Sequence, residues 1–215
     1  MQDYAPQTGE SHGRSTTTVG TTIRQVWYAP DGSTKVREYN QPQSPVGGDV
    51  GGPKPASNID HTGWSDWPDP NRGLPADTAA ARESLLHSAN IAGLGKQERL
   101  SVLKQMAASN LQAGTASPAQ AAAIYRVVAG IPDVFDAGLV ADRIGRRGHA
   151  IGMPMPDPGY TAAIYLIIDP TSGRILQTET TINRPPSALH LPNKPWVDEY
   201  HVVRTVSLVP SKNAK

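Results

Sequence analysis

The 215-residue chain contains no cysteine, a single phenylalanine and no long apolar run. Without cysteine it can form no disulfide framework, thiolate zinc site, iron–sulfur cluster or cysteine nucleophile. The longest uninterrupted apolar run, Ala162–Ile168, is far shorter than the about 18 residues that a membrane-spanning helix needs. Neither sign of charge dominates, with 20 Lys and Arg against 19 Asp and Glu. We therefore expect no nucleic-acid partner, because such domains carry a strong basic excess.

Glycine and proline are abundant but unevenly distributed. Residues 41–75 hold seven prolines and six glycines, a density typical of irregular segments, so we expect a long loop there. A second proline-rich loop is expected over residues 183–196. We expect a flexible arm or a ragged first strand over residues 1–20. The remaining chain then reads as a single domain over residues 21–210, followed by a tail over residues 211–215.

The first ordered segment has the pattern of a β-hairpin. Residues 21–28 and 33–39 alternate and are rich in β-branched and aromatic side chains. The turn between them, Ala29–Gly32, has proline and glycine at positions that favour a tight reversal.

Three helices are predicted after the long loop, over about 77–90, 96–112 and 118–129. Each has an apolar stripe at helical spacing. The third has the clearest start, because Ser117 is a typical N-cap, proline follows it, and Gln120 completes a capping box. Tyr125 lies on the stripe of this third helix and is a candidate for ligand contact.

The last third of the chain reads as an antiparallel meander. Strands are predicted over 137–142, 149–155, 160–168, 174–182 and 200–209, separated by turn residues. Strands, then helices, then strands indicate an α+β fold, with about three helices packed on one face of an antiparallel sheet.

The side chains that carry chemistry form no recognisable site. Six histidines, at positions 12, 61, 87, 149, 190 and 201, lack metal-ligand spacing. Ser101 and Lys104 match a Ser-x-x-Lys pattern, but the accompanying Ser-Asp-Asn and Lys-Thr-Gly elements are missing. We expect these two residues to share a solvated helix face. Accordingly, we expect no metal and no cofactor.

Two aromatic residues stand out within the long loop. Trp64 and Trp67 lie among oxygen-bearing side chains that include Asp66, Asp69 and Asn71, yet the calcium-loop spacing and its distal glutamate are absent. The two tryptophans either anchor the loop on the core or contact a ligand or partner.

A small basic cluster lies on one turn of the meander. Arg143, Arg146 and Arg147 follow one another closely and form a positive patch. Such a patch either contacts an anionic group or is simply a solvated hairpin end.

Several short motifs resemble a family of actinobacterial proteins that have one membrane span and an exported C-terminal domain, and are often encoded beside sigma-factor genes. The motifs are Trp27–Ser33, Leu74–Asp77, Ile131–Val134, Asp142–Ala150 and Ile168–Leu176. The resemblance implies an extracytoplasmic location and a membrane tether in the full-length protein, although no span occurs in this chain. By looser analogy, a curved sheet with helices on its concave face resembles lipoprotein carriers and sigma-regulator sensor domains. The family has no established activity, so it supplies no catalytic residue.

Together these observations favour a non-enzymatic envelope domain that binds a protein partner or a lipid-like, apolar ligand. The alternative is a hydrolase whose site assembles from loops, with His61 or His87 beside Asp66 or Asp69. A third alternative is a passive structural domain whose loops make all partner contacts.

Overall fold

The computed structural model describes residues 2–11, 14–29, 31, 33–40, 44–46, 57–60, 69–89, 91–157, 160–183, 185 and 193–206. Side chains are described for residues 22–29, 31, 33–38, 69–89, 91–155, 161–183, 185 and 193–206. The strands are β1 (Gln2–Ser11), β2 (Arg14–Tyr28), β3 (Thr34–Asn40), β4 (Ser44–Val46), β5 (Ser57–Asp60), β6 (Phe135–Ala141), β7 (Arg147–Asp157), β8 (Tyr160–Ile168), β9 (Ile175–Ile182) and β10 (Trp196–Val202). The helices are α1 (Thr78–His87), α2 (Lys96–Ala113) and α3 (Pro118–Ala129).

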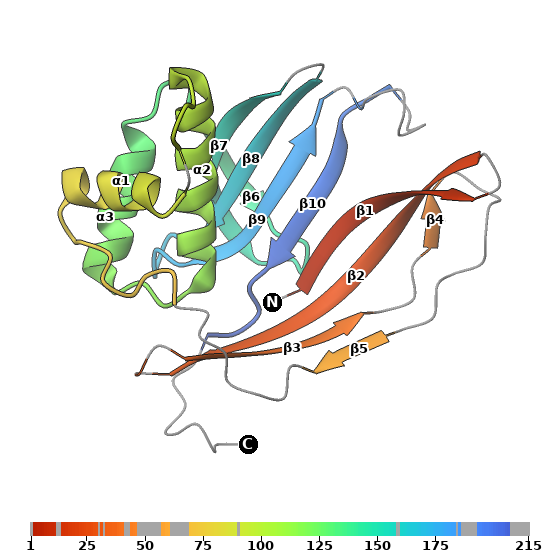
Figure 1. Cartoon of the computed structure of the whole chain (residues 1–215), viewed down its shortest axis with the longest axis horizontal. Helices are drawn as coiled ribbons and strands as arrows, with labels where there is room; N and C mark the ends of the chain where they lie inside the picture. The colour runs from red at the N-terminus through yellow and green to blue at the C-terminus, as the bar shows by residue number, and fades with distance from the viewer. Residues whose placement is uncertain are drawn as a thin grey trace.

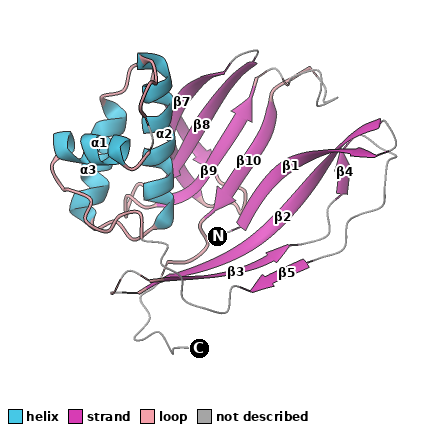
Figure 2. Cartoon of the chain, viewed as in Figure 1, coloured by secondary structure: helices cyan, strands magenta, loops and turns pink. Residues whose placement is uncertain are grey.

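The strands join in one antiparallel sheet with the order β5-β3-β2-β1-β10-β9-β8-β7-β6, and β4 pairs with β2. The three helices gather at the end formed by β7 to β9, while β1, β2, β3 and β5 form a wing at the other end (Figures 1 and 2). The expected α+β fold is confirmed, with an open antiparallel sheet and three helices in the described part of the chain.

The core lies between the helices and one face of the sheet. Strand alternation turns Met153 of β7 and Ile164 and Leu166 of β8 towards the helices, where they join the same buried cluster as Leu103 of α2 and Ile124 of α3. Helix α2 packs against β7 and β9, and the Thr178 hydroxyl on β9 donates a hydrogen bond to the Gln112 side chain of α2 at 2.9 Å.

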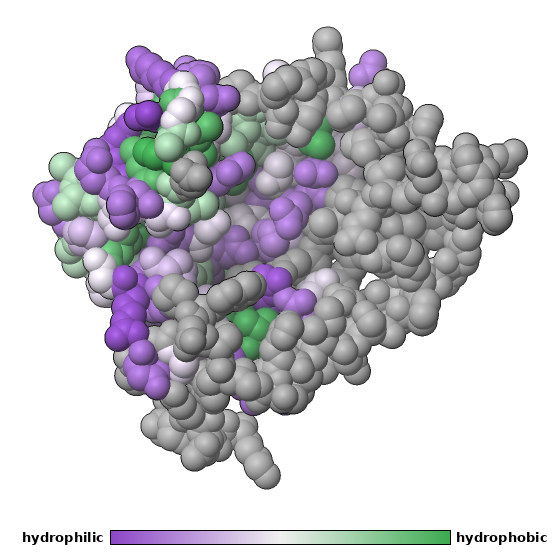
Figure 3. Space-filling model, in the orientation of Figure 1, coloured by the Kyte–Doolittle hydropathy of each residue, from purple (hydrophilic) through white to green (hydrophobic). Residues whose placement is uncertain are grey.

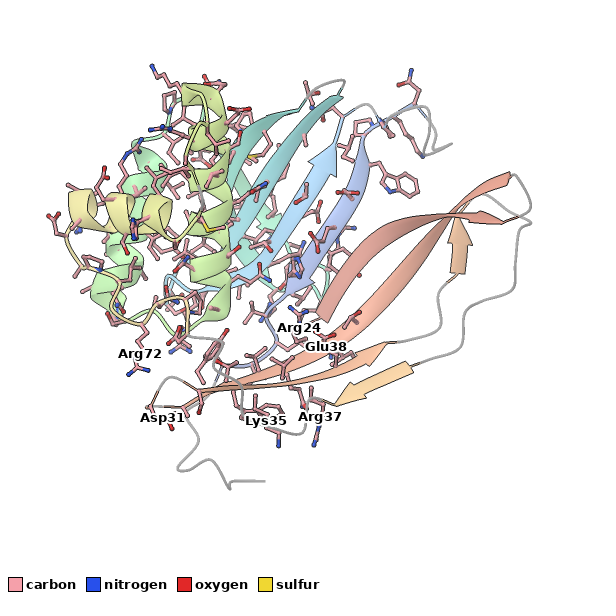
Figure 4. The ribbon with its side chains drawn as sticks, in the orientation of Figure 1. Arg24, Asp31, Lys35, Arg37, Glu38 and Arg72 are labelled. Carbon is pink, nitrogen blue, oxygen red and sulfur yellow. The ribbon has the colours of Figure 1, made fainter. Side chains whose placement is uncertain are left out.

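The wing presents charged side chains on both faces. Arg24 on β2 and Glu38 on β3 form an ion pair of 2.5 Å on the face turned towards the helices, whereas Lys35 and Arg37 point the other way (Figure 4). The expected hairpin over 21–28 and 33–39 is present, as the paired ends of β2 and β3.

Three sequence expectations differ from the structure. Within residues 1–20, where a flexible arm or a ragged first strand was expected, β1 pairs along its whole length with β2, which begins at Arg14. The glycine- and proline-rich segment 41–75 is not loop throughout, because β4 and β5 lie within it and pair with the wing. The last strand, expected over 200–209, is β10 and begins earlier, at Trp196, where it pairs with Ile182 of β9. These differences arise from pairing between strands, which stabilises strands of weak local propensity.

Candidate functional site

The space between the helices and the sheet, one place where an apolar ligand could bind, is filled by side chains. Leu85, Leu103, Ile124, Met153 and Leu166 are each buried almost completely there. Interiors packed in this way leave few voids larger than a water molecule. A depression of about 510 Å³ lies elsewhere, at the end of α1, lined by Glu83, Leu86, His87, Ser88, Ala89 and Ile91. Figure 3 shows apolar residues at the surface over the helices.

Tyr125, a candidate for ligand contact, ties α3 to the turn between β8 and β9. Its hydroxyl donates a hydrogen bond of 2.6 Å to the Gly173 carbonyl. Burial raises the pKa of Tyr125 to about 12, so the hydroxyl keeps its proton at neutral pH. The structure thus gives this side chain a connecting role between a helix and a strand turn.

Arg143, in the β6–β7 turn, reaches the sheet on the face away from the helices. Its guanidinium donates two hydrogen bonds, of 2.8 and 3.0 Å, to one carboxylate oxygen of Glu179 on β9. The same guanidinium lies 5.3 Å from the ring centre of Tyr200 on β10, a cation–π distance. The Arg143 backbone N–H also donates to the Gln177 side chain at 2.8 Å.

Arg146 also stabilises the β6–β7 turn. It forms an ion pair of 2.6 Å with the buried Asp142, and donates a further hydrogen bond of 2.8 Å to the Leu176 carbonyl. Asp142 also accepts from the backbone N–H groups of Ile144 and Arg146. The turn is therefore clamped onto β9 by charge-assisted bonds, which are stronger than neutral ones.

Arg147 differs from its two neighbours. It is exposed, and within the described residues it forms no ion pair. The predicted positive patch is therefore largely compensated, because the charges of Arg143 and Arg146 are matched by Glu179 and Asp142.

The hairpin also displays apolar side chains that sequence reasoning missed. Phe135, Leu139 and Ile144 are 42%, 77% and 47% exposed, and only Val206 joins them among the exposed large hydrophobic residues of the described chain. The Phe135 ring lies edge-on to Tyr165 at 6.1 Å, directly over Gly152, where a β-carbon would come within 2.2 Å of the ring. The β6–β7 hairpin is therefore both firmly held and unusually apolar at its surface.

Strand β6 forms the edge of the sheet. It pairs with β7 on one side and is the last strand of the described sheet on the other. A bulge between Asp136 and Gly138, where Gly138 has a φ of 77°, bends the start of the strand. From Gly138 to Ala141 the ladder is regular, so this stretch offers unpaired backbone groups beside Leu139. We call Gly138–Ala141 and the Leu139 side chain the β6 edge.

Among the described residues, two histidine–carboxylate pairs are present, and neither is one of the predicted pairs. His149 lies 2.7 Å from Asp136, and His201 lies 2.9 Å from Glu199. Thr178 stands opposite His201 in the β9–β10 ladder, but its buried hydroxyl donates to Gln112 instead. The described residues include no group of three or more histidine, aspartate and glutamate side chains that could hold a metal ion.

Of the residues proposed for a hydrolase, His87 is exposed on α1, and the Asp69 carboxylate accepts hydrogen bonds from the Thr115 hydroxyl and the Asn71 N–H. Asp69 therefore belongs to a polar network that joins the loop before α1 to the ends of α2 and α3. His61, Asp66, Trp64 and Trp67 lie outside the described residues.

No protein family, curated protein or solved structure matches this chain. None of the described helices combines the length and apolarity needed to cross a membrane.

Proposed function

We propose that this chain is a non-enzymatic, extracytoplasmic binding or sensor domain that recognises a protein partner through the β6–β7 hairpin. The observation that carries the proposal is the gathering of exposed Phe135, Leu139 and Ile144 on one hairpin. Phe135 and Leu139 stand opposite Gly152 and His149 of β7, so their side chains project from opposite faces of the edge strand. Exposed apolar side chains on a sheet edge are typical of sites that pair with another chain. The extracytoplasmic location rests on the family resemblance of the sequence.

The filled interior supports a protein partner over an apolar ligand. A lipid-like ligand bound between the helices and the sheet would need a cavity where Leu103 and Leu166 already pack. Native mass spectrometry of the protein purified from an actinobacterial host tests this point. We expect the mass of protein alone, and a lipid released reproducibly on unfolding would overturn the proposal.

The position of the contact can be tested by site-specific photo-cross-linking in intact cells. A benzophenone amino acid in place of Leu139 should form an adduct with a polypeptide, because a partner bound to the hairpin would lie against this exposed position. The same group in place of Thr171, exposed in the β8–β9 turn, is the matched control. Adducts from position 171 but not 139 would favour the passive structural domain whose loops make the contacts.

The hydrolase alternative has weaker support. Its proposed Asp69 is engaged by Thr115, and Thr178, the hydroxyl opposite His201, is directed to Gln112. A hydrolase of this kind needs a hydroxyl that donates to the histidine, and both of these hydroxyls donate elsewhere, to Asp69 and to Gln112.

A further inference from the structure

Two buried asparagine side chains carry oxygen atoms without a hydrogen-bond partner. Asn71 lies in the turn before α1 and is 2% exposed, and Asn110 lies on α2 and is 5% exposed. Within the part of the chain that the structure describes, neither side-chain oxygen accepts a hydrogen bond. Leaving a buried polar atom unpaired is costly, and in native proteins such atoms often mark a bound water or ion.

The orientation of both amides is fixed by their nitrogen atoms. Asn71 Nδ2 donates to the Asn110 backbone carbonyl at 2.8 Å, and Asn110 Nδ2 donates to the Met106 backbone carbonyl at 2.8 Å. A carbonyl can only accept, so exchanging oxygen and nitrogen in either amide would bring two acceptors together. The unpartnered atoms are therefore the two oxygens, which can take a hydrogen-bond donor or a cation.

A carboxylate lies beside these amides and supplies a negative charge. The Asp69 Oδ1 atom accepts hydrogen bonds from the Asn71 backbone N–H at 2.9 Å and from the Thr115 hydroxyl at 2.5 Å. Among the described residues, Asp69 forms no ion pair, and its Oδ2 atom accepts no hydrogen bond. The guanidinium of neighbouring Arg72 is directed to the Asp31 carbonyl instead, at 2.5 Å. An uncompensated carboxylate beside amide oxygens favours a cation over a water molecule.

The contacts keep these oxygens near one another. Asn71 Nδ2 is 2.9 Å from the Thr115 hydroxyl oxygen, which also contacts Asp69. The oxygen of the same amide is about 2.3 Å from its nitrogen by covalent geometry, so it lies within about 5 Å of that hydroxyl. Calcium binds oxygens at about 2.3–2.6 Å, so two oxygens on one ion are separated by up to about 5 Å. The spacing around Asn71 therefore fits a calcium ion, and Asn110 adds an oxygen from the residue whose carbonyl the Asn71 amide contacts.

We propose that Asp69, Asn71 and Asn110 bind a calcium ion through their side-chain oxygens, with water completing the coordination. Calcium accepts carboxylate, amide and water oxygens in flexible geometry, whereas magnesium requires near-octahedral geometry and loses its water reluctantly. Asp69 and Asn71 alone lack the calcium-loop spacing, and Asn110 follows Asn71 by 39 positions, so only the fold brings the three together. A single carboxylate makes a weak site, for which we expect a dissociation constant of about 10⁻⁴–10⁻³ M.

Thermal denaturation of the unmodified protein is the first test. We expect about 10 mM calcium chloride to raise the melting temperature by about 3–10 °C relative to EDTA at matched ionic strength, because the ion binds only the folded chain. Magnesium chloride at the same concentration should raise it less. No shift with calcium, or an equal shift with both ions, would overturn the proposal.

Asp69→Asn separates a calcium site from a general effect of charge. The new side-chain oxygen can still accept the hydrogen bonds from Asn71 and Thr115, but the negative charge is lost. Calorimetric titration with calcium chloride should give a dissociation constant roughly tenfold higher, or more, than in the unmodified protein. Asp77→Asn is the matched control, because it removes the same charge from the N-cap of α1, where asparagine caps equally well. Equal affinities in the two variants would overturn the proposal.

Asn110→Leu tests the ligand on α2. Leucine has a similar shape without the oxygen, so in EDTA this variant should be at least as stable as the unmodified protein. The shift in melting temperature caused by calcium should be lost. A variant that keeps the full shift would exclude Asn110 and overturn the site as proposed. The β6–β7 hairpin contributes no residue to this site, so such a failure would leave the proposed function unaffected.

Discussion

The amine of Lys104 on α2 donates a hydrogen bond to the Pro154 carbonyl on β7. Lys104 as a whole is only 4% exposed, so the expectation that Ser101 and Lys104 share a solvated helix face is wrong for Lys104. The long aliphatic stem fills space between helix and sheet, and the carbonyl satisfies the amine at its end. Ser101 is not a hydrogen-bond partner of this amine within the described residues, so the Ser-x-x-Lys pattern is not assembled as a catalytic pair.

The burial of Lys104 predicts a pH dependence of stability. Burial lowers the pKa of Lys104 below its ordinary value of 10.5, partly offset by Asp133. In the window between the lowered folded pKa and 10.5, the unfolded chain binds more protons than the folded chain, so stability rises with pH.

We expect this contribution to disappear in Lys104→Met, which keeps the shape of the side chain without the charge. Chemical denaturation of both proteins at several pH values up to 10.5 measures the difference in their free energies of unfolding. As pH rises, the free energy of unfolding of the native protein should increase relative to that of Lys104→Met. A difference that stays constant would show that the amine is ionised equally in both states.

At the scale of elements, α3 begins as the sequence predicts. The Ser117 hydroxyl accepts from the Gln120 N–H at 3.3 Å, and the Gln120 side chain accepts from the Ser117 N–H at 2.9 Å. The same Gln120 amide also donates to the carbonyls of Asn71 and Leu74. One residue therefore caps a helix and fastens the loop that precedes α1.

This double role predicts an order of effects. Ser117→Ala should cost about 1 kcal/mol of stability, the usual value for a lost N-cap. Gln120→Ala should cost more, because two buried carbonyls also lose their donor. Denaturation of the two variants measures both values. If Gln120→Ala is no worse than Ser117→Ala, the bonds to Asn71 and Leu74 contribute nothing to stability.

Local signals account for the elements that the sequence predicts well. The capping box at Ser117, the apolar spacing of α2 and the apolar run of β8 are each local patterns in the sequence. The contacts that shape the candidate site instead join residues that are far apart in the chain. Arg143 and Glu179 are 36 positions apart, and their pairing requires the β6–β7 turn to reach β9.

The exposed hairpin could not be recognised from sequence for the same reason. Residues 135–141 look like an ordinary half-buried strand, and only the sheet order shows that β6 is an edge. Without that order, Leu139 reads as a core residue and Arg143 as an exposed charge. The sequence shows three arginines close together in one turn, but the acids that compensate Arg143 and Arg146 can be identified only from the fold.

At the scale of the whole molecule, the sheet is joined in its middle by the first strand of the chain. Strand β1 pairs with β2 along its full length, but with β10 only through Gln2, Asp3 and Tyr4. A hydrogen bond from Arg72 to the Asp31 carbonyl, 2.5 Å long, adds a second link between the wing and the helical end (Figure 4). The wing is therefore connected to the rest of the sheet through few backbone pairs.

This narrow junction predicts that the wing and the helix-covered sheet unfold separately. Cooperative units follow contact density, and none of the wing residues whose side chains the structure describes belongs to the core cluster that includes Leu103, Ile124 and Leu166. Deleting residues 2–11 should therefore abolish amide protection in β2 and β3 while β7, β8 and β9 keep theirs. Hydrogen exchange measured by mass spectrometry distinguishes the two groups of strands.

A peptide with the sequence of β1 supplies the control. Added to the shortened protein, it should restore protection in β2, because it offers the same backbone partners in the same register. A peptide of the same composition in scrambled order should not. Loss of protection in β8 together with β2 would mean that the sheet is one cooperative unit, in which the three pairs between β1 and β10 carry stability from one end to the other.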